Sequence, residues 1–290
     1  MTTEAAISYL KMNGLGNDFA VFDARTRALK LTPDLARRIA DRERGVGCDQ
    51  IIILEPSDDA DIFMRILNAD GGEVEACGNA TRCVAVLLMA EFGRPQVTIE
   101  TEAAVLGAIV GEDMTVTVDM GAPRFRWDEI PLAEEFHDTR MIELQVGPID
   151  DPVLHSPSVV NVGNPHCIFW VDDLGEHDLA RIGPFLENHM LFPERANISL
   201  AQITSPDAMT LRVWERGAGL TKACGTAACA ATVAAARKKL TGREVTVTLP
   251  GGPLHIHWRE SDDHILMTGP AELEYEGTLD PALFNGAAVR

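Results

Sequence analysis

Short apolar runs bounded by Gly, Asp and Pro recur along this chain. Such runs, rich in Val, Ile and Phe, are typical of buried strands. They come in groups and do not alternate one by one with helices, so the pattern predicts an α+β fold and not a β-α-β fold. The predicted strands are FAVFDA, QIIIL, DIFMRIL, VTIET, MTVTVDM, CIFWVDD, MTLRVWE, EVTVTL and LHIHW.

Four segments have the pattern of helices. Residues 32–44 and 179–189 each carry one apolar face and are expected to be surface helices with a packing role only. Thr32, followed by a proline, is the expected N-cap of the first. Residues 79–92 and 226–240 are more uniformly apolar, and the second of these is almost all Ala. A helix of such small residues is expected to lie close to surrounding strands, inside a sheet or barrel.

The sequence is duplicated at an offset of 147 positions (224 − 77). Asn17 precedes Cys77 by 60 positions (77 − 17), and Asn164 precedes Cys224 by the same 60 (224 − 164). Ordered blocks at one offset indicate two similar halves that face each other. The aligned blocks are MRILNADGGEVEACG with LRVWERGAGLTKACG and, after a slip of two residues, GRPQVTIET with GREVTVTLP.

The duplication predicts two domains. We expect the first to comprise residues 1–122 together with 269–290 and to contain Cys77. The second is expected to comprise residues 123–268 and to contain Cys224. A further segment, 122–152, has the shift in composition expected where a chain crosses between domains. The length of 290 residues fits two domains of about 145 residues each.

Composition restricts the classes of function. A formal net charge of −19 argues against binding to nucleic acid or to an anionic membrane surface, because both need a basic patch. No segment reaches the roughly 18 uninterrupted apolar residues of a membrane helix, and the opening MTTEAAISYLKMNG lacks the features of a signal peptide. We therefore expect a cytoplasmic protein whose six cysteines are free thiols.

Two cysteines occupy equivalent positions just before the apolar helices. Cys77 and Cys224 each follow a loop of small residues in an Ala-Cys-Gly step. A helix N-terminus carries about half a positive charge and unpaired N–H groups, so this position is expected to lower a thiol pKa and to hold a carboxylate. Two such thiols in mirrored halves predict racemisation, in which one group removes a proton and the other delivers one from the opposite face. The alternative is that both are structural residues at helix starts.

The other four cysteines, at positions 48, 83, 167 and 229, lie in apolar or small-residue runs. They are expected to be inert core residues. The spacings from 77 to 83 and from 224 to 229 differ from the Cys-x-x-Cys loops of zinc sites, so we predict no metal.

Six motifs run in order over nearly the whole chain. They are KMNGLGNDF, NADGGEVEACGNATRC, VGNPHCIFWVDD, RANISL, RVWERGAGLTKACGTAACA and MTGPAELEYEG. Together they resemble the diaminopimelate epimerase family. The resemblance implies a cofactor-independent isomerase that interconverts LL- and meso-diaminopimelate on the route to lysine and peptidoglycan. It also implies two pseudo-symmetric α+β domains, each a curled, mostly antiparallel sheet around a central helix, with the active site in the cleft between them, and a homodimer.

The resemblance assigns roles to residues of this sequence. Cys77 and Cys224 are the expected acid and base. Glu215 is the expected partner of the reacting ammonium group, and His166 a polar neighbour that tunes a cysteine. Tyr275 matches a tyrosine at the family's dimer contact. The residues expected to bind the zwitterionic substrate are Asn17, Gln50, Asn68, Gly78, Asn79, Asn164, Asn197, Glu215, Arg216, Gly225 and Thr226.

Within this set, the residues that follow each cysteine are expected to hold the reacting carboxylate. The Asn residues and Arg216 are expected to hold the distal amino-acid end, with Gln50 close by. The chemistry agrees, because a planar guanidinium matches a carboxylate through two parallel hydrogen bonds.

Four positions depart from the usual family pattern. Asn13 stands where His is commoner, and Ala80 and Ala227 replace glycines after the Cys-Gly steps. Leu220 replaces a Glu, and the sequence offers no reason for it. The two alanines are expected to be tolerated because they fit helical dihedrals.

Three other functions remain open at this point. A racemase of the same architecture could act on proline, hydroxyproline or histidine, although proline has no distal charged end for Arg216 to hold. A non-catalytic amino-acid-binding protein would need the cleft but not both thiols. Two facing cysteines could also act as a redox pair, although a disulfide would inactivate an enzyme that needs both thiols.

Overall fold

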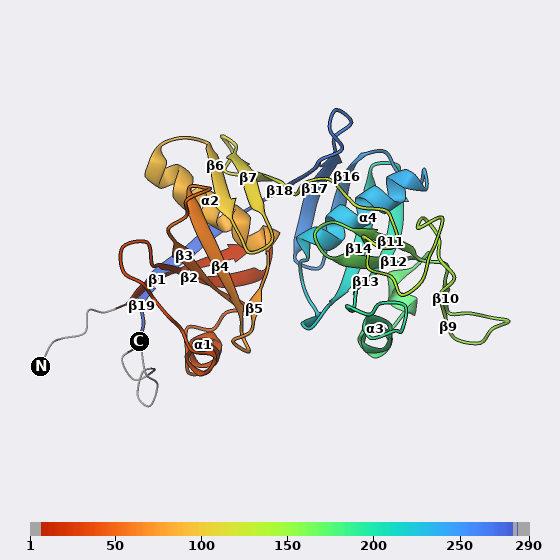
Figure 1. Cartoon of the computed structure of the whole chain (residues 1–290), viewed down its shortest axis with the longest axis horizontal. Helices are drawn as coiled ribbons and strands as arrows, with labels where there is room; N and C mark the ends of the chain where they lie inside the picture. Colours follow the sequence, from red (N-terminus) through yellow and green to blue (C-terminus); the bar gives the residue numbers. More distant parts are fainter. Residues whose placement is uncertain (1–6, 281–282, 284–290) are drawn as a thin grey trace, which may run out of the picture. The chain divides into compact units, whose positions relative to one another are not determined.

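The structure is a computed structural model that describes residues 7–280 and 283. The chain forms two compact units, of which one runs to Val118 and resumes at Pro270, and the other spans Asp119–Gly269 (Figure 1). Each unit is a curled sheet with one apolar helix in its middle and one amphipathic helix outside. The predicted α+β class is confirmed.

The first unit is built from one sheet and two helices. Its elements are β1 Ser8–Gly14, β2 Asn17–Asp23, α1 Pro33–Ala40, β3 Gln50–Glu55, β4 Ile62–Asn68, β5 Glu73–Val74, α2 Gly78–Phe92, β6 Gln96–Glu100, β7 Val105–Val110, β8 Val116–Asp119 and β19 Glu272–Thr278. Neighbouring strands follow the order β19-β1-β2-β3-β4-β6-β7-β8. The pairs β2/β3 and β4/β6 are parallel and the others in this order are antiparallel.

The second unit repeats this plan. Its elements are β9 Gln145–Val146, β10 Leu154–His155, β11 Ser158–Asn161, β12 Pro165–Trp170, η1 Leu174–Glu176, α3 Leu179–Glu187, β13 Asn197–Ser205, β14 Ala208–Glu215, β15 Gly219–Leu220, α4 Gly225–Arg237, β16 Glu244–Leu249, β17 Gly252–Trp258 and β18 Ile265–Gly269. Neighbouring strands follow the order β11-β12-β13-β14-β16-β17-β18. The parallel pairs are β12/β13 and β14/β16, and one antiparallel pair lies between them, as in the first unit.

The duplication extends to the pairing register of the strands. In the parallel pair of the first unit, Phe19 lies opposite Gln50, and in the second unit His166 lies opposite Asn197. Both partners are therefore shifted by the same 147 positions (166 − 19 and 197 − 50). Residues that are equivalent in the sequence thus occupy equivalent places in the two sheets.

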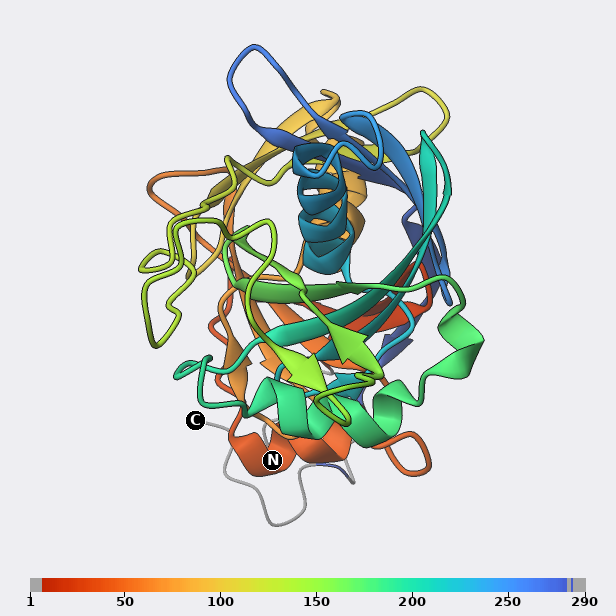
Figure 2. The same cartoon turned by 90° about the vertical axis from the view of Figure 1, so that its right-hand side faces the viewer.

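The central helix α4 is almost entirely buried, and α2 is buried over its first turns. The side chains of α4 that face the strands are nearly all Ala, and the helix packs against β11, β12, β13, β16, β17 and β18. Figure 2 shows α4, in blue, inside its curled sheet. Small side chains allow this because they let the helix axis approach strands on several sides. Among the described residues no helix is long and apolar enough to cross a membrane.

The outer helix α1 begins where the sequence predicts. The hydroxyl of Thr32 accepts a hydrogen bond from the Leu35 backbone N–H at 3.2 Å, which satisfies one of the unpaired donors of the first turn. Leu35 and Ile39 lie one turn apart on the buried face. The predicted N-cap is confirmed.

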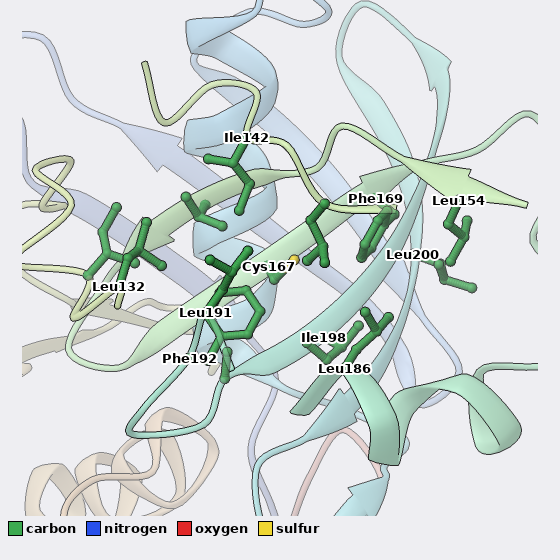
Figure 3. Packing of buried hydrophobic residues seen from close by; sticks show 14 of the residues in the cluster. Leu132, Ile142, Leu154, Cys167, Phe169, Leu186, Leu191, Phe192, Ile198 and Leu200 are labelled. Atoms are coloured by element: carbon green, nitrogen blue, oxygen red, sulfur yellow. The ribbon is translucent and has the colours of Figure 1, made fainter. Parts of the chain in front are cut away.

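One hydrophobic cluster of the second unit draws on the segment 122–152. Leu132 and Ile142 from this segment pack with Cys167, Phe169 and Leu200 (Figure 3). The segment therefore belongs to the core of this unit. The cysteines at 48, 83, 167 and 229 are all buried and free, as predicted.

Candidate active site

Each repeated cysteine is the N-cap residue of its central helix. Cys77 precedes α2 with φ −148° and ψ 106°, and Cys224 precedes α4 with φ −125° and ψ 107°. Both are extended, so each sulfur leaves the chain beside the first N–H groups of a helix, which have no intrahelical acceptor. Gly78 and Gly225 are the first residues of the two helices. The predicted placement at helix starts is confirmed.

In the first unit three predicted site residues form a cluster. The thiol of Cys77 lies 3.8 Å from Asn17 Oδ1, which also accepts a hydrogen bond from Asn79 Nδ2 at 3.2 Å. Gly14 backs this cluster, because a Cβ at that position would stand only 3.0 Å from the Asn79 carbonyl oxygen. The start of α2 and the turn between β1 and β2 are therefore in close contact.

Two further predicted residues lie opposite each other on β3 and β4. Gln50 Nε2 donates to Asn68 Oδ1 at 3.0 Å across this antiparallel pair. The oxygen of the Gln50 side-chain amide, Oε1, is buried and has no hydrogen-bond partner among the described residues. A buried acceptor without a partner is costly, so this atom is suited to accept a hydrogen bond from a bound ligand.

The surroundings of Cys224 differ from the prediction in one respect. Its side chain is 4% exposed, its sulfur lies 3.5 Å from the Thr226 hydroxyl, and the carboxylate of Glu215 is a neighbour. Burial, and then the negative charge of Glu215, raise the pKa of the Cys224 thiol well above its ordinary value. The expectation that the helix start lowers this pKa is wrong here, because desolvation and a like charge outweigh the N–H groups of α4.

Asn197 and Arg216 lie together at the adjacent ends of β13 and β14. The Arg216 backbone N–H donates to Asn197 Oδ1 at 3.0 Å, and Asn197 Nδ2 donates to the Pro165 carbonyl at 3.0 Å. The guanidinium is held in turn by the Glu194 carbonyl, at 3.1 Å from Nη1. These contacts fix the base of the Arg216 side chain close to an amide that is also a predicted substrate ligand.

His166 is fully buried and neutral. Its Nε2 lies 2.8 Å from Asn164 Oδ1, and its Nδ1 has no partner among the described residues. Burial, and then the charge of Arg216, lower the pKa of His166 to about 3. The described contacts thus link His166 to Asn164, and its role in tuning a cysteine stays a prediction.

The remaining singled-out residues lie on strands or in the first turns of the central helices. Tyr275 is on β19, half exposed, with its ring edge-on to Tyr9 at a centroid distance of 6.3 Å. Asn13 closes the turn after β1, because its Oδ1 accepts from the Gly16 N–H at 2.7 Å. Leu220 pairs with Trp214 in the short strand β15, and nothing in the structure explains its replacement of a Glu. Ala80 and Ala227 are buried in the first turns of α2 and α4, as expected.

Three residues that were not predicted from the sequence form hydrogen bonds to predicted site residues. Asp49 accepts a hydrogen bond from Asn17 Nδ2 at 3.1 Å, and Arg82 Nη2 donates to Asn79 Oδ1 at 3.0 Å. Thr221 donates its hydroxyl to Glu215. A signal for Arg82 was present, since a charged residue interrupts an apolar helix pattern. Asp49 and Thr221 sit in loop segments without any such pattern.

Two pockets among the described residues are not lined by predicted site residues. One is lined by Arg65, Glu73, Val74, Glu75 and Glu102, and the other by Gln145, Val146, Ile182, Phe185, Leu186 and His189. The candidate site is therefore defined by the groups around the two cysteines and not by a cavity.

Solved structures share the duplicated fold. A hydroxyproline epimerase from Agrobacterium vitis matches with a TM-score of 0.68 and 15% identity over 97% of this chain and 95% of its own. A predicted epimerase from Pseudomonas aeruginosa matches with a TM-score of 0.67 and 19% identity over 94% and 99%. At such identities the likeness shows the fold alone.

Sequence comparisons give the family. A diaminopimelate epimerase family model matches residues 9–126 and 158–274. A diaminopimelate epimerase from Brucella anthropi is 58% identical over 285 residues, 97% of this chain and 94% of its own. One from Nitrobacter hamburgensis is 56% identical over 291 residues, 99% and 100% of the two chains. The duplicated fold and these relatives define an isomerase. The chain belongs to the diaminopimelate epimerase family, which confirms the resemblance seen in its motifs.

Proposed function

We propose that this chain interconverts LL- and meso-diaminopimelate by a two-base mechanism, without a cofactor, in the biosynthesis of lysine and peptidoglycan precursors. Membership of the family supports the reaction and the substrate. One observation supports the mechanism: in both units the N-cap residue of the central helix is a cysteine.

In the proposed reaction one cysteine, as thiolate, removes the α-proton, and the thiol of the other delivers a proton to the opposite face. The charge that develops moves into the α-carboxylate. Donors at the two helix starts, from Gly78 and Asn79 and from Gly225 and Thr226, would hold this carboxylate. Such donors stabilise the transition state because they are already oriented toward the developing charge.

Glu215 would couple substrate binding to the ionisation of Cys224. Its carboxylate raises the pKa of that thiol in the structure. If the reacting ammonium group of the substrate pairs with Glu215, this repulsion is largely cancelled. Binding of the substrate itself would then favour the thiolate that the reaction needs.

The distal amino-acid end of the substrate would be held by Arg216 and by the amides of both units. Arg216 suits a carboxylate through paired N–H donors, and its backbone is fixed by Asn197. The amides that would complete this end of the site are Asn17, Gln50, Asn68, Asn164 and Asn197. Proline and hydroxyproline lack a distal zwitterion, so these residues favour diaminopimelate over the ligands of the related racemases.

Location and assembly belong to the same proposal. We expect the protein to work in the cytoplasm as a homodimer, with Tyr275 at the contact between subunits. The half-exposed ring of Tyr275 on β19 is compatible with such a contact. The acidic surface, with a net charge of −19, suits a small zwitterionic substrate better than a nucleic acid or an anionic membrane.

The test is hydrogen exchange in heavy water. Freshly reduced protein given LL-diaminopimelate, without pyridoxal phosphate, is expected to form the meso isomer with deuterium at one α-carbon. Cys77→Ala and Cys224→Ala should each reduce turnover by at least about a thousandfold, within the range of a lost acid or base. Cys83→Ala is the control, because this buried thiol lies in the core of α2.

Three outcomes would contradict the proposal. Exchange on proline and none on diaminopimelate would show the related racemase. Binding without exchange would show a non-catalytic binding protein. A cysteine variant with near-full rate would remove that residue from the mechanism.

A further inference from the structure

We propose that Asp49 and Arg82 are positioning residues, which orient two amides so that an oxygen and not an NH2 group faces the thiol of Cys77. The inference rests on the proposed function, in which Cys77 transfers a proton. It concerns residues that contact neither the substrate nor the reacting atoms in the proposed mechanism. Their effect would pass through Asn17 and Asn79.

The orientation follows from a hydrogen-bond chain with chemically defined ends. Arg82 Nη2 donates to Asn79 Oδ1 at 3.0 Å, and Asn79 Nδ2 donates to Asn17 Oδ1 at 3.2 Å. Asn17 Nδ2 then donates to Asp49 Oδ2 at 3.1 Å. A guanidinium can only donate and a carboxylate can only accept. Neither amide can therefore be turned over without placing two donors or two acceptors face to face.

The direction of these hydrogen bonds determines which atom of Asn17 lies next to the sulfur of Cys77. Asn17 Oδ1 points to Cys77 Sγ at 3.8 Å, so the thiol proton has an acceptor. A hydrogen bond to the neutral form of an acid favours that form, whereas an NH2 group in the same place would favour the thiolate. The chain of amides thus presents an acceptor to the Cys77 thiol, which favours its neutral form.

Both ends of the chain have further hydrogen-bond partners. Arg82 is fully buried and its Nε donates to the Pro270 carbonyl at 3.1 Å. The second oxygen of Asp49 accepts from Arg42 Nη2 at 2.6 Å, and Arg42 also bonds Asp18 at 2.8 Å. Asp49 therefore has a fixed partner on each oxygen, and the bond to Asn17 is one of them.

The arrangement is not duplicated in the second unit. The position equivalent to Asp49 is Ala196 (49 + 147), and the position equivalent to Arg82 is Cys229 (82 + 147). Asn164, the counterpart of Asn17, uses its Oδ1 toward His166 instead. Asn17 Oδ1 is thus bonded to Asn79 and lies beside a thiol, whereas Asn164 Oδ1 is bonded to an imidazole, so the two equivalent asparagines have different partners.

The experiment compares Asp49→Ala with Asp49→Asn. Alkylation of Cys77 by iodoacetamide is followed across pH by mass spectrometry of the peptide that contains it, in full-length reduced protein without substrate. In Asp49→Ala the pH of half-maximal alkylation should fall, with a rate near neutral pH about fivefold above wild type, as for the loss of one hydrogen bond. Asp49→Asn removes the same charge but keeps an oxygen that can accept from Asn17, so it should stay close to wild type.

The two Asp49 variants should also differ in turnover. The kcat of Asp49→Ala is expected to fall about tenfold with a smaller change in KM, as for a displaced catalytic group, and Asp49→Asn should recover most of it. At the other end, Arg82→Lys keeps a donor-only group and should retain the wild-type alkylation profile, whereas Arg82→Met should shift it. Arg42→Ala is the matched control, because it removes a charge next to Asp49 but leaves the bond to Asn17.

Equal shifts in Asp49→Ala and Asp49→Asn would overturn the inference, since charge alone would then explain them. An unchanged profile in Asp49→Ala would overturn it as well. The alkylation test uses no substrate, so its outcome does not depend on which amino acid the enzyme accepts. Failure of the proposed function would appear separately, as absent deuterium exchange in the wild-type protein.

Discussion

The two cysteines occupy equivalent backbone positions in chemically different surroundings. Cys77 lies beside the amide oxygen of Asn17, whereas Cys224 is buried beside the carboxylate of Glu215 and the hydroxyl of Thr226. A helix N-terminus is common to both, and it does not set the ionisation of Cys224 by itself. The side chains around each sulfur differ because only the backbone plan is duplicated.

The charge on Glu215 gives a direct prediction for Cys224. Glu215→Gln removes the negative charge that raises the pKa of this thiol, so that pKa should fall. Alkylation of Cys224 at pH 8 should be faster than in wild type while turnover is lost. Glu244→Gln, an exposed carboxylate of the same unit, is the control and should change neither rate. A slower alkylation in Glu215→Gln would contradict the assignment.

His166 predicts a pH dependence of stability. Its pKa in the fold is about 3, below the 6.5 of an unperturbed histidine, so the unfolded chain binds the extra proton first. The free energy of unfolding should therefore fall as pH drops from about 6.5, by up to about 1.4 kcal/mol per pH unit from this residue alone. His166→Gln should remove this part of the slope in urea unfolding at pH 7, 6 and 5. Parallel losses in wild type and variant would show that other groups cause it.

At the scale of single elements, the local sequence predicted many of the strands and helices. Alternating and continuous apolar runs identified strands such as β3 and β16, and the cap and apolar face identified α1. Which strands pair in parallel was not predictable, because local periodicity carries no information about distant partners. The parallel pairs β2/β3 and β12/β13 each join strands separated by a long connection that contains a helix.

The cap of α1 can be tested on its own. Thr32→Ala should lower the free energy of unfolding by about 1 kcal/mol, since the Leu35 N–H loses its acceptor. Thr32→Ser keeps the oxygen and should stay near wild type in the same denaturant titration. An equal loss in both variants would point to the methyl group and not to the cap.

At the scale of the whole molecule, the two units differ in how the chain builds them. The second unit is one continuous segment, Asp119–Gly269. The first is closed only when β19 returns from the far end of the chain and pairs with β1 over six residue pairs. The contact is close, because a Cβ on Gly277 would stand 2.5 Å from the Tyr9 ring.

This difference predicts which part can fold alone. A fragment of residues 119–269 should show a cooperative unfolding transition, because its core and its strands β11 to β18 come from one continuous segment. A fragment ending at Val118 should lack one, because β1 would lose one of its two partner strands and the sheet would lose its edge strand. Circular dichroism during urea titration distinguishes the two cases. Addition of a peptide containing β19 should restore structure to the fragment that ends at Val118. Cooperative unfolding of that fragment without the peptide would contradict the prediction.

The sequence by itself determined the four α-helices, nine of the strands, the duplication, the place of both cysteines at helix starts and the family, whereas strands such as β1, β7, β13, β18 and β19 were not predicted. These features are encoded locally, in apolar periodicity, capping residues and short motifs, and so can be recognised without coordinates. Only the tertiary structure decided the direction in which the pKa of Cys224 moves and the partners of Asn17. Burial and charge at a sulfur depend on Glu215, and the orientation of Asn17 depends on Asp49, which is distant from Cys77 in sequence. The physical reason is that desolvation and hydrogen-bond polarity are properties of packed neighbours, which the chain brings together only on folding.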